Sequence, residues 1–152
     1  MLKFVKLLAV FVLMTSTNAY SQIKNKLYVN IDGFDIAADK CNVQKQTILT
    51  PAILTLRNNK IQYTNENTFP YLYIHTNLQI SSNSSSCIYS VTVEIIDEKP
   101  PEKRNGFKSY YNERISLCRQ GAIGGGALNI LHNEISNAVE RSIKSCLTEV
   151  DY

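Results

Sequence analysis

The sequence lacks a strong charge of either sign once its N-terminal segment is set aside. The 152 residues include 16 Lys and Arg and 13 Asp and Glu, which gives a formal net charge of +3. Lys3 and Lys6 lie in a segment that we expect to be removed, and without them the formal charge falls to +1. Because the positive and negative charges are nearly balanced, the net charge does not favour a nucleic-acid partner.

A second long apolar run is also absent from the sequence. Residues 7–14 are all apolar, they follow the two lysines, and the small residues Thr17 and Ala19 come after them. This is the pattern of a secretory signal peptide, and no later run of about 18 apolar residues could span a membrane. We therefore predict a signal peptide over residues 1–19, cleaved after Ala19 or after Ser21. Residues 20–152 are expected to form a single small α+β domain, periplasmic or secreted, without a transmembrane anchor.

The Cys-x-x-Cys spacing is missing, although the chain has four cysteines. Cys41, Cys87, Cys118 and Cys146 are separated by 46, 31 and 28 residues. An even number of cysteines in an exported protein predicts two disulfides, whereas wide spacing does not favour a zinc site or a redox-active pair. Because no cysteine directly follows the apolar run, we do not expect a lipid anchor at this end of the chain.

Familiar catalytic and nucleotide-binding motifs are absent as well. The sequence contains no Gly-x-Ser-x-Gly, Gly-Lys-Ser/Thr or His-Glu-x-x-His, and His75 and His132 are its two histidines. Residues 121–126 are rich in glycine and precede a helical pattern, but they lack the lysine of a phosphate-binding loop. We interpret them as a flexible connection between a strand and a helix. The sequence therefore predicts no catalytic residue, no metal ligand and no cofactor, and it favours a protein that is not an enzyme.

Apolar and polar residues alternate in several segments, which is typical of strands with one buried face. Strands are expected at residues 27–32, 61–64, 71–80, 87–96 and 110–119. The residues expected to face inward are Leu27, Val29, Ile31, Leu72, Ile74, Leu78, Ile80, Tyr89, Val91, Val93, Ile95, Ile115 and Leu117. Since one face of these strands is apolar and the other polar, the sheet is expected to be covered on one side.

Two segments show the spacing of apolar residues found in helices. The first begins near Asp39 and ends at Asn58, and Pro51 is expected to kink it or to start a new helix capped by Thr50. A hairpin over residues 53–64 is the alternative for its second half. The second helix is expected over residues 127–147. Its apolar stripe consists of Leu128, Leu131, Ile135, Val139, Ile143 and Leu147.

The predicted order of elements is β-α-β-β-β-α. This order favours an α+β fold in which an antiparallel or mixed sheet of four to five strands carries two helices on one face and is stapled by disulfides. The arrangement resembles the small periplasmic domains of outer-membrane assembly proteins, such as the lipopolysaccharide-assembly lipoproteins. The resemblance is one of topology, and it implies no functional residue for this chain.

The polar face of the predicted sheet carries the candidate binding residues Tyr28, Tyr71, Tyr73 and His75. Tyrosine offers a large contact area with a polar tip and is enriched at recognition surfaces, although it also suits exposed strands. No lysine or arginine lies among these side chains, which disfavours a nucleic-acid platform. We predict a binding or envelope-assembly module that recognises a protein or cell-envelope component through this face. The alternative is a small secreted enzyme or enzyme inhibitor.

The disulfide pairing can be predicted if every element reverses the direction of the one before it. Cys41 and Cys146 then meet at one end of the sheet, while Cys87 and Cys118 meet at the other. Because bridged Cα atoms lie within roughly 7 Å, the predicted bridges are Cys41–Cys146 and Cys87–Cys118. Cys118 is out of phase with Ile115 and Leu117, so we also expect a bulge or an early strand end near Cys118.

Overall fold

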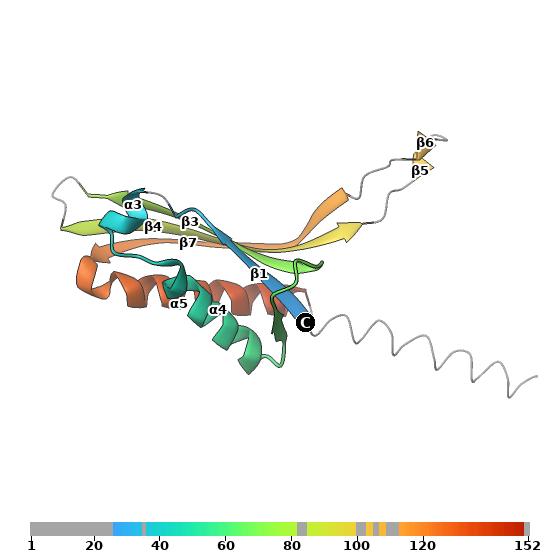
Figure 1. Ribbon diagram of the computed structural model, residues 1–152, viewed down its shortest axis with the longest axis horizontal. Helices are drawn as coiled ribbons and strands as arrows, with labels where there is room; N and C mark the ends of the chain where they lie inside the picture. The colour runs from blue at the N-terminus through green and yellow to red at the C-terminus, as the bar shows by residue number, and fades with distance from the viewer. Residues whose placement is uncertain are drawn as a thin grey trace, which may run out of the picture.

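The computed structural model describes residues 26–34, 36–81, 85–99, 103–104, 107–108 and 113–150. The predicted signal peptide and both cleavage positions lie outside the described residues. The described elements are, in chain order, β1 (Lys26–Asp32), α3 (Ile36–Lys40), α4 (Lys45–Asn58), β2 (Gln62–Thr64), β3 (Tyr71–Ile80), β4 (Ser86–Lys99), β5 (Lys103–Arg104), β6 (Phe107–Lys108), β7 (Glu113–Ala127) and α5 (Leu128–Glu149) (Figure 1).

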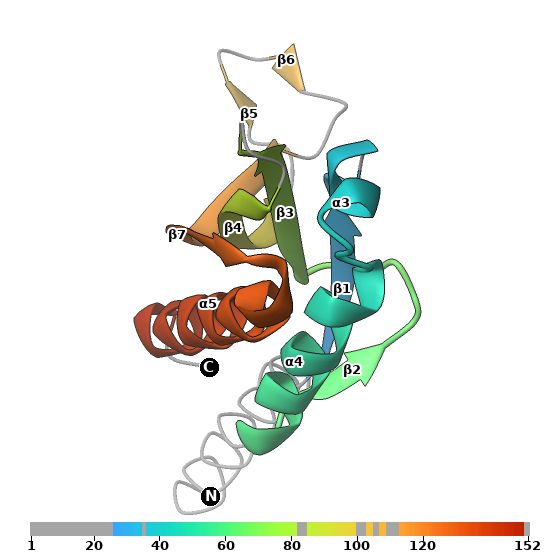
Figure 2. The ribbon, with the colours of Figure 1, turned by 90° about the vertical axis from the view of Figure 1, so that its left-hand side faces the viewer.

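Five strands form one mixed sheet in the order β2-β1-β3-β4-β7. β1 runs parallel to both of its neighbours, whereas β3, β4 and β7 follow one another antiparallel. The helices α4 and α5 pack side by side on one face of this sheet (Figure 2). The α+β fold with two helices on one face and the order β-α-β-β-β-α is therefore confirmed.

The core lies between this face of the sheet and the two helices. The predicted alternation holds along β1, β3 and β4, because the side chains expected to face inward are buried there, apart from the partly buried Ile80. The stripe of α5 is also buried from Leu131 to Leu147, and Ala138, Ser142 and Cys146 fill the positions between. Because each element buries one face, apolar residues recur in its sequence with the period of a strand or a helix.

Pro51 does not start a new helix, so the prediction of a helix start capped by Thr50 is wrong. Pro51 lies inside α4, which runs without interruption from Lys45 to Asn58. A proline has no N–H for the carbonyl four residues before it, which here belongs to Thr47. Ser136 of α5 donates its hydroxyl to that carbonyl at 3.2 Å, so a neighbouring helix satisfies the group that proline leaves unpaired.

The helical segment instead breaks earlier, at residues 41–44, between α3 and α4. Asn42 has a φ of 54°, a left-handed conformation that ends α3. Because residues 53–58 belong to α4, the alternative of a hairpin over residues 53–64 is also wrong.

The glycine-rich residues 121–126 are not a loop but the second half of β7, which corrects the sequence-based interpretation. Gly124 lies opposite Tyr89 of β4 in the register. A Cβ on Gly124 would fall 2.6 Å from the tyrosine hydroxyl, so only glycine leaves room for this buried ring. The aromatic ring thus covers the strand at a position that has no side chain of its own.

The four cysteines form two disulfides, but the predicted pairing is wrong. The bridges are Cys41–Cys87, with Cα atoms 6.1 Å apart, and Cys118–Cys146, with Cα atoms 5.4 Å apart. Neither Cys41–Cys146 nor Cys87–Cys118 forms, because the chain does not reverse between β2 and β3.

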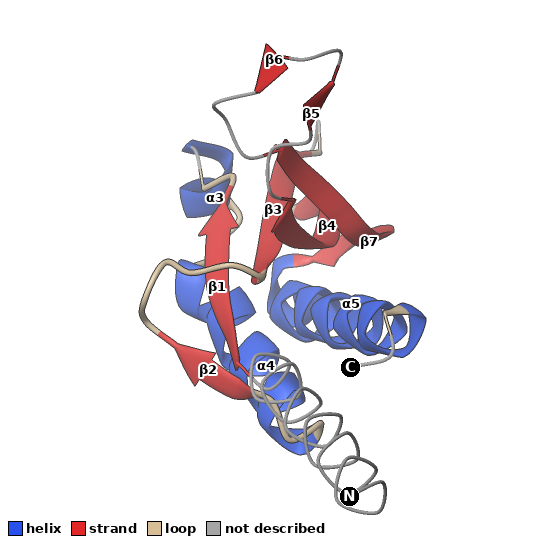
Figure 3. Ribbon diagram, turned by 90° about the vertical axis from the view of Figure 1, so that its right-hand side faces the viewer, coloured by secondary structure: helices blue, strands red, loops and turns tan. Residues whose placement is uncertain are grey.

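The connection over residues 65–70 crosses β1 without reversing the direction of the chain, so β2 and β3 point the same way. Both Thr64, where β2 ends, and Tyr71, where β3 begins, are register partners of Tyr28, and the connection crosses β1 on the face opposite α4 (Figure 3). β3 therefore runs parallel to β1, and Cys87 opens β4 at the end of the sheet near Cys41. α5 then runs back along the sheet and brings Cys146 to Cys118.

The predicted bulge near Cys118 is confirmed. The register shifts between Ile95, which faces Cys118, and Ile96, which faces Ser116. Leu117 is the extra residue, and it is exposed instead of facing inward as predicted, whereas Cys118 is buried. The bulge thus turns the cysteine toward the core, where it can reach α5.

Candidate functional site

The face of the sheet opposite α4 and α5 is the open face (Figures 2 and 3). Alternation and register place on it the outward residues of three adjacent strands. They are Tyr28, Asn30, Asp32, Tyr71, Tyr73, His75, Asn77, Gln79, Ser90, Thr92 and Glu94. The residues that the sequence predicts for binding are among them, so the strand geometry agrees with their predicted direction, while their role in binding stays a prediction.

A cluster of three side chains, Tyr73, Asp32 and His75, lies on β1 and β3 of the open face. Asp32 and His75 are register partners on β1 and β3, and Tyr73 precedes His75 by two residues on the same face. The Tyr73 hydroxyl donates to Asp32 Oδ2 at 2.6 Å, and His75 Nδ1 donates to Oδ1. The two rings stack with centroids 6.4 Å apart. Each carboxylate oxygen therefore fixes one ring, and the three side chains form one ordered unit.

The hydrogen bonds of the cluster stabilise the ionised carboxylate. Burial acts to raise the pKa of Asp32, but the hydrogen bonds from Tyr73 and His75, together with the electrostatic effect of His75, outweigh it, so this pKa lies below its usual value of 3.8. The hydrogen bond to Asp32, with burial and the carboxylate charge, raises the pKa of Tyr73 from 10.0 to about 12. Asp32 thus stays ionised, and Tyr73 stays a hydrogen-bond donor, across the neutral range.

The other two predicted binding residues lie next to the cluster but do not join it. Tyr71 is 7 % exposed and packs edge-to-face against Phe69 of the crossing connection, with ring centroids 5.1 Å apart. The Arg114 guanidinium lies 5.9 Å from the centre of the Phe69 ring. Tyr28, the register partner of Tyr71, is partly buried. Tyr71 therefore packs against the connection, and its role in binding, like that of Tyr28, stays a prediction.

Asp32 is the residue that the sequence-based reasoning missed. Asp32 is the last residue of the strand predicted over residues 27–32, and alternation along this strand is the one signal that places it on the same face as the tyrosines. Asp32 also borders an open depression of about 810 Å³ that continues past the end of β1. Phe34, Asp39 and Lys45 are among the residues that line this depression. Asp32 is thus the member of the cluster that borders both the open face and this depression.

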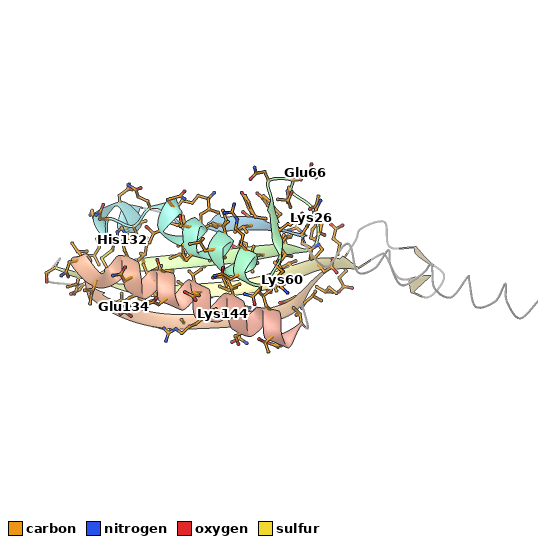
Figure 4. All side chains as sticks on the ribbon, turned by 90° about the horizontal axis from the view of Figure 1, so that it is seen from below. Lys26, Lys60, Glu66, His132, Glu134 and Lys144 are labelled. Atoms are coloured by element: carbon orange, nitrogen blue, oxygen red, sulfur yellow. A yellow bond between two sulfur atoms is a disulfide. The ribbon has the colours of Figure 1, made fainter. Side chains whose placement is uncertain are left out.

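His132 has a structural role instead of a place in the cluster. It lies in the first turns of α5, on the helical side of the molecule (Figure 4). Its Nε2 donates to the carbonyl of Asn42, the residue with left-handed backbone between α3 and α4. In the described ranges, no three His, Cys, Asp or Glu side chains gather in a way that could hold a metal ion. No helix in those ranges is both long and apolar enough to cross a bilayer.

Comparison with known proteins gives little beyond the structure itself. No protein-family model matches the chain, and no curated protein matches it by sequence. Among solved structures, the chain is similar to a minor lipoprotein from Acinetobacter baumannii, with 14 % sequence identity over 83 % of this chain and 87 % of that chain and a TM-score of 0.31. A likeness at this TM-score carries no argument about function.

Proposed function

We propose that this chain is an exported, non-catalytic binding or envelope-assembly module that recognises a protein or cell-envelope component through its open sheet face. The observation that carries the proposal is the Tyr73–Asp32–His75 cluster, an ordered group of polar and aromatic side chains on the face that the two long helices do not cover. Two disulfides fit a domain that works in an oxidising compartment.

The fixed conformations of the three side chains favour a role in recognition over a role that only keeps the surface soluble. Side chains that are already fixed lose little conformational freedom when a partner binds, so more of the contact energy appears as affinity. The Tyr73 and His75 rings offer apolar area, while the ionised carboxylate and the imidazole offer an acceptor and a donor within the same patch. Asn77, Ser90 and Thr92 extend the polar surface across β3 and β4.

A photo-crosslinking experiment in the native cell envelope tests the proposal. A photoreactive amino acid at Asn77, which is exposed beside the cluster, is expected to give a discrete cross-linked product. The same amino acid at Leu54, which is 51 % exposed on α4, is the control on the helical side. The Tyr73→Ala/His75→Ala variant is expected to reduce the Asn77 product at least tenfold, because it removes both rings of the cluster.

The matched control variant is Glu140→Ala/Lys144→Ala. It also removes an exposed polar pair, an ion pair of 2.6 Å on α5, and it should leave the product unchanged. Circular dichroism of both variants must show the same folded state as the original chain. Equal cross-linking at Asn77 and Leu54, or an unchanged product in the cluster variant, would reject the open face as the binding surface.

An enzymatic function is the second candidate, and one observation favours it. The Asp32 carboxylate orients His75 through Nδ1, which is the arrangement that positions a histidine as a general base. Under this alternative, a hydrolytic activity detected in the purified protein would be lost in His75→Ala and kept in His132→Ala. If both variants keep the activity, the enzymatic function is rejected.

A further inference from the structure

The second half of β7 presents an edge of the sheet. β7 is the last strand in the order β2-β1-β3-β4-β7, so in the described part of the chain no strand pairs with its outer side. Proteins usually protect such edges with charged residues, prolines or bulges. The first half of β7 has the bulge at Leu117 and the exposed Arg119. Residues 121–127 contain no charge and no proline.

Exposed isoleucines surround this unprotected half of the strand. Ile123 is 82 % exposed and points to the open face. Ile88, 51 % exposed, lies on the same face of β4 opposite Gly125. Ile130 of α5, 47 % exposed, lies against Gly126, because a Cβ there would meet its Cδ1 at 3.0 Å. Large apolar side chains gathered at a strand edge indicate a surface that a partner covers.

We propose that a second copy of this chain covers this edge, with residues 121–127 of the two copies paired as antiparallel strands about a twofold axis at Gly124. In this register Ile123 faces Gly125 of the second copy. Gly125 has no side chain, so Ile123 can pass over it and reach Ile88 of the second copy on the next strand. The two copies thereby bring four isoleucines together on one side of the seam.

The opposite side of the seam is apolar as well. In the same register Ala122 faces Gly126 of the second copy, against which Ile130 of that copy packs. Ile123 and Ile130 of one copy therefore each meet a small residue of the other. The segment is complementary to itself, and this complementarity favours a second copy over an unrelated strand.

The charges of the paired segment and the symmetry of the pairing also favour a second copy of this chain. The paired segment is neutral, and Arg119 would lie opposite Asn129, beyond the end of the partner's strand, so the pairing opposes no like charges within it. A twofold axis perpendicular to the sheet keeps both open faces on one side. It also uses the same edge of both copies, so the assembly closes as a dimer and does not extend further.

Sedimentation and light scattering of the mature chain over a range of concentrations test the proposal. The original chain is expected to be a dimer that dissociates on dilution. Ile123→Lys is expected to raise the dissociation constant at least about a hundredfold, because it places two lysines near each other across the seam. Leu54→Lys, an equally drastic change at a 51 % exposed site on α4, is the matched control and should keep the dimer.

A cross-link establishes the register and covers the case in which Ile123→Lys misfolds. Ile123→Cys places one free thiol on each copy, and a short bismaleimide should join the two copies through it, whereas Leu54→Cys should give no product. A chain that is monomeric at all concentrations, a series of species larger than the dimer, or Ile123→Cys chains that do not cross-link would each overturn the proposal. If the chain is monomeric, an extended segment of another protein becomes the candidate partner for this edge.

Discussion

Replacing Gly124 with alanine tests whether the glycine-rich residues form a strand that packs beneath Tyr89. A Cβ on Gly124 would lie 2.6 Å from the Oη and 2.7 Å from the Cζ of Tyr89, closer than such atoms pack. The ring is buried, and its hydroxyl donates to the Glu134 carbonyl at 3.3 Å. Tyr89 therefore cannot turn aside without losing both its burial and its hydrogen bond.

The magnitude follows from comparison with Gly121 on the same strand. Forcing a methyl group into a packed site costs about 1 to 3 kcal/mol. At Gly121, the nearest atom to a new Cβ is the Val91 carbonyl oxygen, 3.5 Å away. Alanine is expected to stabilise that position by about 0.5 to 1 kcal/mol, because glycine loses more conformational freedom in a strand. The same gain applies at Gly124, so the free energies of unfolding of Gly124→Ala and Gly121→Ala should differ by the packing cost of about 1 to 3 kcal/mol.

Urea unfolding of the oxidised chain without the predicted signal peptide, followed by circular dichroism, measures both free energies. A Tyr89→Leu background removes the ring that opposes the new methyl group, so Gly124→Ala should lose its penalty there. The reasoning is refuted if Gly124→Ala and Gly121→Ala unfold at the same urea concentration. It is also refuted if the penalty at Gly124 persists without the ring.

Two further predictions concern the disulfides and the polar cluster. Peptide mapping without reduction should recover Cys41–Cys87 and the bridge between the other two cysteines. Replacing both cysteines of Cys41–Cys87 by alanine should cost about 4 kcal/mol from loop entropy, slightly more than the about 3.6 kcal/mol for the second bridge, which closes a shorter loop. For the cluster, NMR titration of labelled tyrosine should find one pKa near 12 that falls toward 10.0 in Asp32→Asn. Since folding raises this pKa, its stabilising effect is present below pH 10.0 and is lost as the pH rises to about 12, so equal pH dependence of unfolding in the original chain and Asp32→Asn would contradict it.

The strands β3 and β4 and the helix α5 could be predicted from the sequence because each buries a single face. Where one face meets the core and the other meets water, the sequence repeats with the period of the element. The bulge near Cys118 could be predicted for the same reason, since a buried cysteine out of phase with its strand requires an extra residue.

Pro51 and the glycine-rich residues could not be predicted correctly because distant residues decide their structure. Pro51 is accommodated in α4 by Ser136, a hydroxyl 85 positions later in the chain. The glycines of β7 are held in a strand by Tyr89 and the rest of β4. Local propensity disfavours both structures, and tertiary contacts outweigh it.

The sequence does not indicate that β1 and β3 pair in parallel. For this reason neither the disulfide pairing nor the cluster could be predicted from it. The six residues of the connection, 65–70, are long enough to reverse the chain, and nothing in them indicates that they cross β1 instead. Once β3 runs beside β1, Asp32 comes opposite His75 and the cluster forms. Alternation alone places Tyr73, His75 and Asp32 on the polar face, whereas only the register shows that the three side chains meet.

The connectivity of the bridges bears on how the protein is made. The first cysteine of the chain pairs with the second, and the third pairs with the fourth. A chain that enters an oxidising compartment N-terminus first presents Cys41 and Cys87 before the other two thiols. A thiol oxidase that joins cysteines in order of arrival therefore makes both native bridges directly. For a chain exported in this way, as the predicted signal peptide would direct, oxidation in order of arrival forms no non-native bridge that an isomerase would have to exchange.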